Sequence, residues 1–214
     1  MKQKIKLCGM MRDCDIEFAN AALPDYVGFV FAETRRKVTI EQAAKFRAML
    51  HKDIQAVGVF VDADVTYVGG LLKEGIIDIA QLHGKEDAEY VSRLRDICDK
   101  PVIKAVKVIC KEDVITTAKL DVDYLLLDTY RKGVPGGTGE RFDWDIIDEL
   151  RENERGQEIC GKPFFLAGGL NTGNLREAAA VGAYGLDIST GIETDGYKDR
   201  YKMIDAVQIV RKCR

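Results

Sequence analysis

The 214-residue chain has only two histidines, and its six cysteines form no CxxC pair. Because a zinc site built from His and Cys needs such ligands at short spacing, no metal site is predicted. The chain also lacks any apolar run near the ~20 residues of a membrane span. The short run after Lys4 has neither the length nor the cleavage site of a signal peptide. These absences predict a cytosolic protein with reduced thiols and no membrane partner.

An excess of charge of one sign is also missing. The chain has 32 Lys and Arg residues against 35 Asp and Glu residues, for a net charge of −3, and the two signs are interspersed. Such a surface offers no basic field, so nucleic acid is not an expected partner and any anion site must be local. With 46% hydrophobic residues, residues 1–214 are predicted to form one domain with a sizeable core.

What the sequence does contain is a regular alternation of short apolar runs and helical patterns. The apolar runs predict eight strands: Lys4–Cys8, Tyr26–Phe31, Gln55–Val61, Asp78–Leu82, Val102–Val108, Asp123–Asp128, Pro163–Ala167 and Gly185–Ser189. The patterns between them predict helices near Arg12–Ala22, Thr39–Leu50, Val65–Glu74, Ala88–Cys98, Glu112–Lys119, Trp144–Asn153, Asn174–Val181 and Lys198–Arg211. Strands joined through helices are parallel. Eight such units predict an α/β fold, a single (β/α)8 (TIM) barrel, with a doubly wound open sheet as the alternative.

Small residues fill the turns after the last two predicted strands. Gly168 and Gly169 follow one strand, and Ser189, Thr190 and Gly191 follow the next. Two such turns beside helix N-termini would direct main-chain N–H groups toward one point, which attracts a phosphate group. Barrels commonly bind phosphate in their seventh and eighth loops. We therefore predict that the protein takes a small phosphorylated substrate and holds its phosphate here.

In a barrel, the carboxyl ends of the strands face one shared mouth, so residues at those ends are the candidates for chemistry. Cys8 ends the first strand, Arg36 follows the second, and Asp128 ends the sixth. The longest irregular connection, residues 130–141, comes directly after Asp128 and contains a Gly-Gly-Thr-Gly sequence suited to folding over a ligand. The predicted mouth therefore combines a thiol, a guanidinium and a carboxylate with a phosphate site.

Short motifs follow one another along almost the whole chain. They read KLCG (6–9), GFVF (28–31), QLHG (81–84), LDT (127–129), GGTG (136–139) with FDW (142–144), AGGLN (167–171) and DISTGIE (187–193). Their order and joint occurrence resemble the phosphoribosylanthranilate isomerase family, barrel enzymes of tryptophan biosynthesis. The resemblance implies an Amadori rearrangement of N-(5-phosphoribosyl)anthranilate to 1-(2-carboxyphenylamino)-1-deoxyribulose 5-phosphate, with no cofactor.

The resemblance also implies roles for three residues. Cys8 is the general base, Asp128 is the general acid, and Arg36 faces the anthranilate carboxylate. The segment around Arg36 departs from the usual family pattern, so Arg35 is the alternative for the last role. The physical requirements are compatible, since a nearby cation favours a thiolate and burial or negative charge keeps a carboxyl group protonated.

Three further residues are predicted to contact the substrate or support the site. His83 is placed at its wall, Gly137 belongs to the long glycine-rich loop, and Asp187 is expected to orient or balance charge near the eighth strand. A Schiff-base lysine is a separate possibility. Because side chains alternate along a strand, at most one of Lys104 and Lys107 points inward.

Other functions remain open from the sequence. One is a histidine-pathway aminoimidazole isomerase, although Cys8 stands where that enzyme would have an Asp. Another is a lysine-dependent aldolase, and a third is a barrel retained only for ligand or partner binding, which would not require Cys8 and Asp128. The expected assembly is a monomer or a homodimer.

Overall fold

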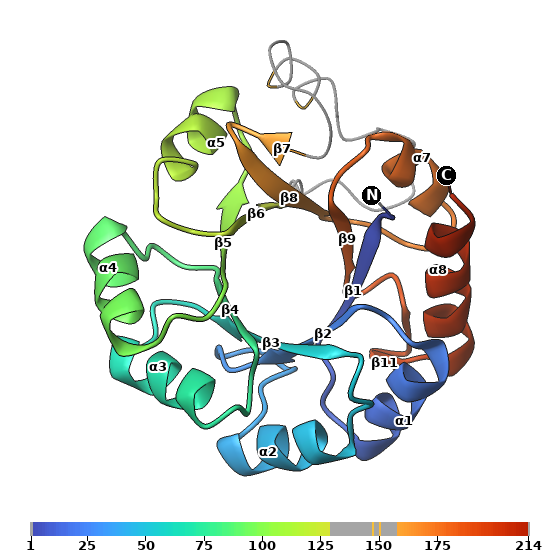
Figure 1. Ribbon diagram of the computed structural model, residues 1–214. Helices are drawn as coiled ribbons and strands as arrows, with labels where there is room; N and C mark the ends of the chain where they lie inside the picture. The colour runs from blue at the N-terminus through green and yellow to red at the C-terminus, as the bar shows by residue number, and fades with distance from the viewer. Residues whose placement is uncertain (1, 129–146, 148–149, 151–157, 214) are drawn as a thin grey trace.

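A ring of eight parallel strands organises the computed structural model, which describes residues 2–128, 147, 150 and 158–213 (Figure 1). The strands are β1 (Lys4–Cys8), β2 (Tyr26–Val30), β3 (Gln55–Phe60), β4 (Ile79–Leu82), β5 (Val102–Lys107), β6 (Tyr124–Asp128), β8 (Lys162–Ala167) and β9 (Gly185–Ile188). They pair in the order β6-β5-β4-β3-β2-β1-β9-β8, and pairing of β6 with β8 closes the ring. The predicted closed barrel is confirmed, and the open doubly wound sheet is excluded.

Helices surround the ring of strands. They are α1 (Asp13–Ala22), α2 (Ile40–Met49), α3 (Val65–Lys73), α4 (Ala88–Ile97), α5 (Lys111–Thr117), α7 (Leu175–Ala180) and α8 (Arg200–Lys212). Thr39, Asp64 and Asp87 start three of them by accepting N–H groups of the first turn. Among the described helices, none is long and apolar enough to cross a membrane. The helix predicted over 144–153 and the loop over 130–141 lie almost wholly outside the described residues.

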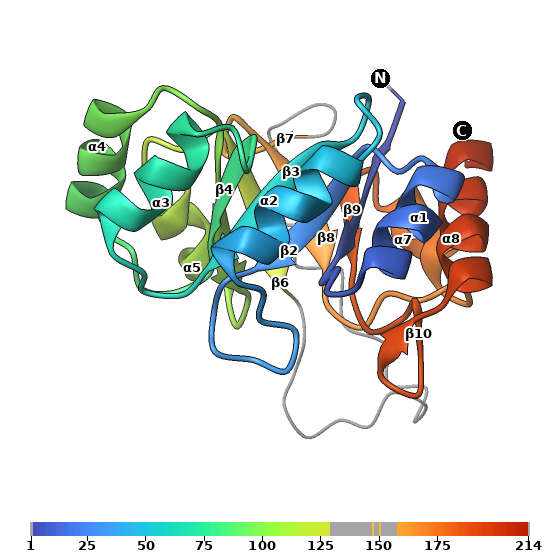
Figure 2. The ribbon, with the colours of Figure 1, turned by 90° about the horizontal axis from the view of Figure 1, so that it is seen from below.

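Two short antiparallel elements supplement the barrel. Strand β7 (Glu158–Ile159) pairs with the start of β8, and β10 (Glu193–Thr194) pairs with β11 (Tyr197–Lys198) in a hairpin between β9 and α8. No pattern in the sequence had predicted this hairpin. In Figure 2 the hairpin and the connection from β2 to α2 project from one end of the barrel, while both termini lie at the other. The projecting end is the carboxyl end of the strands, and so the mouth.

Apolar side chains form two layers on either side of the barrel wall. Leu7, Phe29 and Leu125 belong to the large cluster between strands and helices. Side chains on the opposite strand face fill the barrel itself, including Val57 and Phe165. Both layers arise from one period-two alternation along each strand. Near the mouth, polar and reactive groups replace the inner apolar layer.

Candidate active site at the mouth of the barrel

The Cys8 thiol lies at the carboxyl end of β1, on the inner face of the barrel. It is buried and packs with Val30 and Val59 of the neighbouring strands. The residue paired with Cys8 on β2 is Gly28, where a Cβ atom would come within 2.6 Å of the sulfur. The register of β1 and β2 therefore provides the space that the sulfur occupies.

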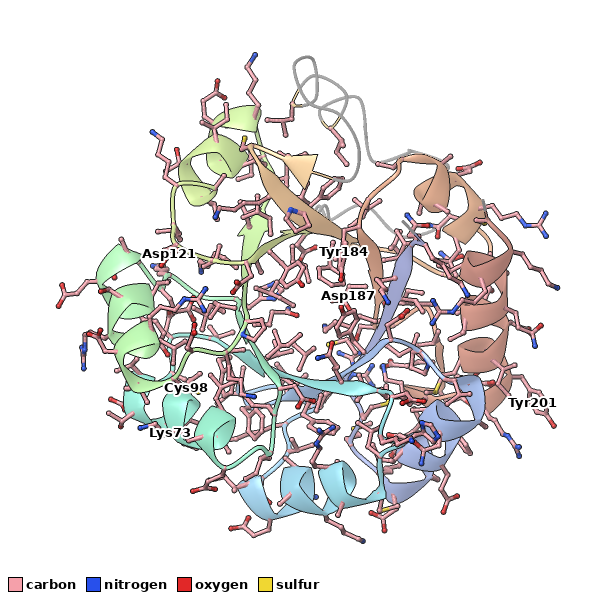
Figure 3. All side chains as sticks on the ribbon, viewed as in Figure 1. Lys73, Cys98, Asp121, Tyr184, Asp187 and Tyr201 are labelled. Carbon is pink, nitrogen blue, oxygen red and sulfur yellow. The ribbon has the colours of Figure 1, made fainter. Side chains whose placement is uncertain are left out.

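A buried ion pair lies one layer below the thiol. Lys6 is fully buried, and its Nζ donates to both carboxylate oxygens of Asp187 at 3.0 Å. These residues are direct partners in the β1–β9 ladder, and Figure 3 shows the Asp187 side chain inside the ring of strands. Asp187 thus has a charge partner that the sequence analysis missed. Side-chain alternation along the strand could have indicated this partner, because Lys6 is two residues before Cys8 and therefore lies on the same face.

Opposing influences act on the Cys8 thiol. Burial raises its pKa, Lys6 and Lys198 lower it, Asp187 raises it, and the net result is a raised pKa. Burial lowers the pKa of Lys6, but the negative charges of Asp187 and of an ionised Cys8 outweigh it, so that pKa is raised. Lys6 therefore stays cationic. At neutral pH Cys8 is mainly the neutral thiol, with its thiolate as the minor form.

On the other side of the mouth, Asp128 ends β6 and meets His83 from the loop after β4. His83 Nε2 is 3.4 Å from Asp128 Oδ2, and His83 Nδ1 is 3.0 Å from Gln81 Nε2. These two contacts place the His83 ring between Gln81 and Asp128. His83, predicted as a wall residue, is thus in direct contact with the predicted acid.

The two arginines after β2 point to different places. The Arg36 side chain is 17% exposed and lies across Gly9, where a Cβ atom would come within 2.5 Å of its Cδ. Arg35 is 51% exposed, and its Nη1 donates to the Gly196 carbonyl in the β10–β11 hairpin at 2.7 Å. Since Gly9 directly follows Cys8, Arg36 is the arginine that lies next to the end of β1.

Both arginines contact Glu193 at the start of β10. Arg36 donates from Nε to Oε1 at 2.8 Å and from Nη2 to Oε2 at 3.0 Å, and Arg35 Nη2 also donates to Oε2. Lys198 Nζ donates to Oε1 at 2.8 Å. Although burial raises the pKa of Glu193, its hydrogen bonds and ion pairs with Arg36 and Lys198 bring it down to about 2. Sequence reasoning gave neither Glu193 nor Lys198 a role.

The two predicted phosphate turns lie next to each other. Asn171 and Gly191 form an isolated parallel bridge, and a Cβ atom at Gly191 would lie 1.9 Å from the Leu170 carbonyl oxygen. Ser189 Oγ donates to the Cys8 carbonyl at 3.3 Å. The structure therefore brings the turns together beside the main chain of Cys8, while phosphate binding itself stays a prediction.

The N-terminus of α8 does not adjoin these turns as the sequence pattern suggested. The β10–β11 hairpin intervenes, and the helix starts at Arg200. Asp199 caps it by accepting the N–H groups of Tyr201 and Lys202 at 2.9 and 3.1 Å. Because these donors are already satisfied, α8 has little to offer an anion, and the turns themselves are the candidate cradle.

The remaining predicted residues are the two candidate Schiff-base lysines and Gly137. Lys104 lies on the outer face, where its Nζ donates to Glu86 and to the Gly84 carbonyl, both at 2.7 Å, so it is not a Schiff-base lysine. Lys107 shares the strand face of the inward residues of β5, consistent with the expectation that at most one of the two lysines points inward. Gly137 lies outside the described residues.

Relatives match this chain along nearly its whole length. The family model described as N-(5'phosphoribosyl)anthranilate (PRA) isomerase matches residues 5–209. An N-(5'-phosphoribosyl)anthranilate isomerase from Endomicrobium trichonymphae is 44% identical over 209 residues, 97% of this chain and 98% of that protein. One from Acetivibrio thermocellus is 40% identical over 217 residues, 98% of this chain and 96% of that protein.

Solved structures give the same picture. Phosphoribosyl anthranilate isomerase from Thermotoga maritima has a TM-score of 0.82 and 29% identity, covering 97% of this chain and 98% of that one. A phosphoribosyl anthranilate isomerase in complex with reduced 1-(o-carboxyphenylamino)-1-deoxyribulose 5-phosphate has a TM-score of 0.79 and 27% identity, with the same coverage.

Proposed function

The chain belongs to the N-(5'-phosphoribosyl)anthranilate isomerase family, and we propose that Cys8 and Asp128 serve its reaction as general base and general acid. The protein is an isomerase of tryptophan biosynthesis that performs an Amadori rearrangement of N-(5'-phosphoribosyl)anthranilate. The observation that carries the residue assignment is their placement around one mouth. Strands β1 and β6 end in these two residues, and β8 and β9, which end in the glycine turns, separate them along the ring.

The first step opens the furanose ring. Asp128 donates its proton to the ring oxygen, the bond from that oxygen to C1′ breaks, and the nitrogen lone pair forms the C1′ iminium. Asp128 must therefore be protonated when substrate is bound, a state that the negative charges of the substrate favour. His83 Nε2 lies 3.4 Å from Asp128 Oδ2 and is positioned to orient the carboxyl group.

The second step removes the C2′ proton. The Cys8 thiolate accepts it, and the electron pair of the C–H bond moves to the iminium to form an enolamine, which tautomerises to the ketone. Lys6 and Lys198 are the cations that lower the pKa of the buried thiol, against the raising effects of burial and Asp187. No electrons enter or leave overall, since the product is an isomer of the substrate.

The two ends of the substrate carry negative charges that need separate partners. We assign the anthranilate carboxylate to Arg36, because its guanidinium lies over Gly9 next to Cys8 whereas Arg35 reaches the hairpin. We assign the phosphate to the turns of Gly168, Gly169, Ser189, Thr190 and Gly191. The ligand of the similar solved complex bears both a carboxyl group and a phosphate, which supports this two-ended arrangement. His83, Gly137 and Asp187 remain proposed as further substrate contacts.

One assay tests the function directly. Phosphoribosylanthranilate generated chemically in the cuvette is fluorescent, and adding the purified protein should abolish that fluorescence at a rate proportional to protein concentration. A protein that leaves the fluorescence unchanged, or that instead turns over an aminoimidazole substrate of the histidine-pathway type, would contradict the assignment.

The setting of the enzyme belongs to the same proposal. We propose a cytoplasmic enzyme with a single catalytic domain over residues 1–214 that acts on a small phosphorylated substrate. A monomer or a homodimer is expected, and one similar structure is of monomers generated from the dimeric phosphoribosylanthranilate isomerase of Thermotoga maritima. Sedimentation equilibrium of the purified chain would decide between the two states.

A further inference from the structure

The Arg36 guanidinium, proposed above to bind the substrate carboxylate, is already paired with a carboxylate of the protein. Glu193 accepts from Nε at 2.8 Å and from Nη2 at 3.0 Å. A guanidinium carries five N–H donors in a rigid planar arrangement, so a carboxylate on one edge leaves another edge available. Glu193 occupies the Nε/Nη2 edge, and the Nη1/Nη2 edge remains.

The second edge carries donors that Glu193 does not use. Among the residues described, none accepts a hydrogen bond from Arg36 Nη1, and the side chain retains 17% exposure. Three N–H donors of the group therefore remain unused, two on Nη1 and one on Nη2. Two of these, one on each Nη, point in parallel away from the edge that Glu193 occupies, which is the geometry that binds a carboxylate in a bidentate manner.

Glu193 is itself firmly held. Its side chain is 6% exposed, and Lys198, which is fully buried in its side chain, donates to Oε1 at 2.8 Å and also to the Ser189 carbonyl at 2.9 Å. Lys202 Nζ donates to the Glu193 main-chain carbonyl at 2.7 Å. The carboxylate is thus fixed through several contacts that do not involve Arg36.

The stem of Arg36 is fixed as well. Its Cδ lies over Gly9, which has a φ of 88° and no side chain to push the arginine away. A long arginine side chain loses considerable rotamer entropy when it is ordered by a ligand. A guanidinium that is ordered in advance avoids that loss on binding.

We propose that Glu193 is a positioning residue that holds the Arg36 guanidinium with its outer edge presented to the substrate carboxylate. This inference rests on the proposed function, in which Arg36 receives that carboxylate. The opposite arrangement, in which Glu193 competes with the substrate for Arg36, makes the reverse prediction about affinity.

The test is a cycle of protein variants and ligands. The two ligands are reduced 1-(2-carboxyphenylamino)-1-deoxyribulose 5-phosphate and the same compound without the ring carboxyl group. Calorimetry on the wild type gives a Kd for each ligand. The Kd of the ligand without the ring carboxyl group, divided by the Kd of the ligand that has it, is a ratio that reports the contribution of the carboxylate alone. Glu193→Gln should lower this ratio about tenfold, since charge-assisted hydrogen bonds of Arg36 become misaligned.

Two further variants complete the design. Thr194→Val removes the 2.8 Å hydrogen bond to Asp199 in the same hairpin, so it loosens the hairpin without touching the Glu193 carboxylate and should leave the ratio unchanged. Glu193→Asp keeps the charge but withdraws it by one methylene, and it should also lower the ratio, which keeps the test valid if Glu193→Gln fails to fold.

The outcomes are distinct. An unchanged or increased ratio in the Glu193 variants, with a large ratio in the wild type, overturns the positioning role and leaves the proposed function intact. A wild-type ratio near one means that Arg36 does not bind this carboxylate, and both proposals then lose their basis. A fall in the Glu193 variants with none in Thr194→Val supports the inference.

Discussion

The Nζ atom of Lys6 lies 3.0 Å from each carboxylate oxygen of Asp187, inside the barrel and one layer below Cys8. The register of β1 and β9 pairs these residues directly although 181 positions separate them in the chain. The pair keeps a cation permanently next to a buried thiol. Charged residues inside the barrel therefore influence the pKa of the thiol at its mouth.

The first prediction concerns the acid–base pair. Cys8→Ser and Asp128→Asn should each fold and bind the reduced product analogue, while kcat falls by at least roughly 10²-fold, because each removes a group that moves a proton in the transition state. Calorimetry and the fluorescence assay measure the two properties separately. Near-normal kcat in either variant would remove that residue from its assigned role.

The second prediction concerns pH. Burial raises the pKa of Cys8, so the thiolate fraction is small at pH 7 and increases as the pH rises. The thiolate of the free enzyme, followed by its ultraviolet absorbance against Cys8→Ser, should therefore keep increasing beyond pH ~8.5, the usual value for a thiol. A titration from pH 6 to 10 would show this, and a thiolate signal that is complete before neutrality would contradict it.

The third prediction concerns the Lys6–Asp187 pair. Lys6→Met leaves the Asp187 carboxylate buried without its partner, which should cost about 3–5 kcal/mol of unfolding free energy. The double variant Lys6→Met with Asp187→Asn removes both charges and should recover most of that stability. Denaturant unfolding measures both.

The same variants test the effect of Lys6 on the thiol. In the wild type, Lys6 lowers the Cys8 pKa and Asp187 raises it. The double variant lacks both charges, so the net change in the Cys8 pKa shows which of the two has more influence on the sulfur. Of these two residues, Lys6 has the larger effect on the Cys8 pKa, so we expect the thiolate titration of the double variant to move to higher pH. A folded double variant whose thiolate titration is identical to that of the wild type would argue against this electrostatic role.

The fourth prediction separates the two arginines. Arg36→Ala should weaken binding of the carboxylated product analogue by about tenfold or more, the loss expected for a charged hydrogen-bonding partner. Arg35→Ala is the matched control, since it removes the neighbouring arginine and another Glu193 contact at a more exposed position. If Arg35→Ala produces the larger loss, the carboxylate is bound by the adjacent residue.

The fifth prediction concerns stability in acid. The pKa of Glu193 is lowered to about 2 in the folded protein, from an ordinary value of 4.5. A lowered carboxyl pKa adds stability above pH ~4.5 that is lost as the pH falls toward ~2, and here it amounts to about 3 kcal/mol. The unfolding free energies of the wild type and Glu193→Gln should therefore converge over this range. A constant difference between them would show that Glu193 does not titrate as described.

Much of the fold and part of the site followed from local patterns. Short apolar runs separated by helical segments identified the eight strands, and a strand-to-helix repeat of eight units closes a barrel. Cys8 and Asp128 were recognisable because they end strands, and the carboxyl ends of parallel strands share one mouth. Arg36 was identified only with Arg35 as an alternative, because the direction of two neighbouring loop side chains depends on what they contact.

The sequence by itself determined which residues form strands, which face each side chain takes and which residues reach the mouth, since these depend on neighbours a few positions away. Only the tertiary structure decided that Lys6 pairs with Asp187 and that Glu193 joins Arg36 to Lys198. Those contacts require ring closure, strand register and the hairpin before α8. Charged residues that become neighbours only when the ring closes are far apart in the chain and leave no local sequence pattern. The partners of the reactive groups could therefore be identified only in the folded barrel.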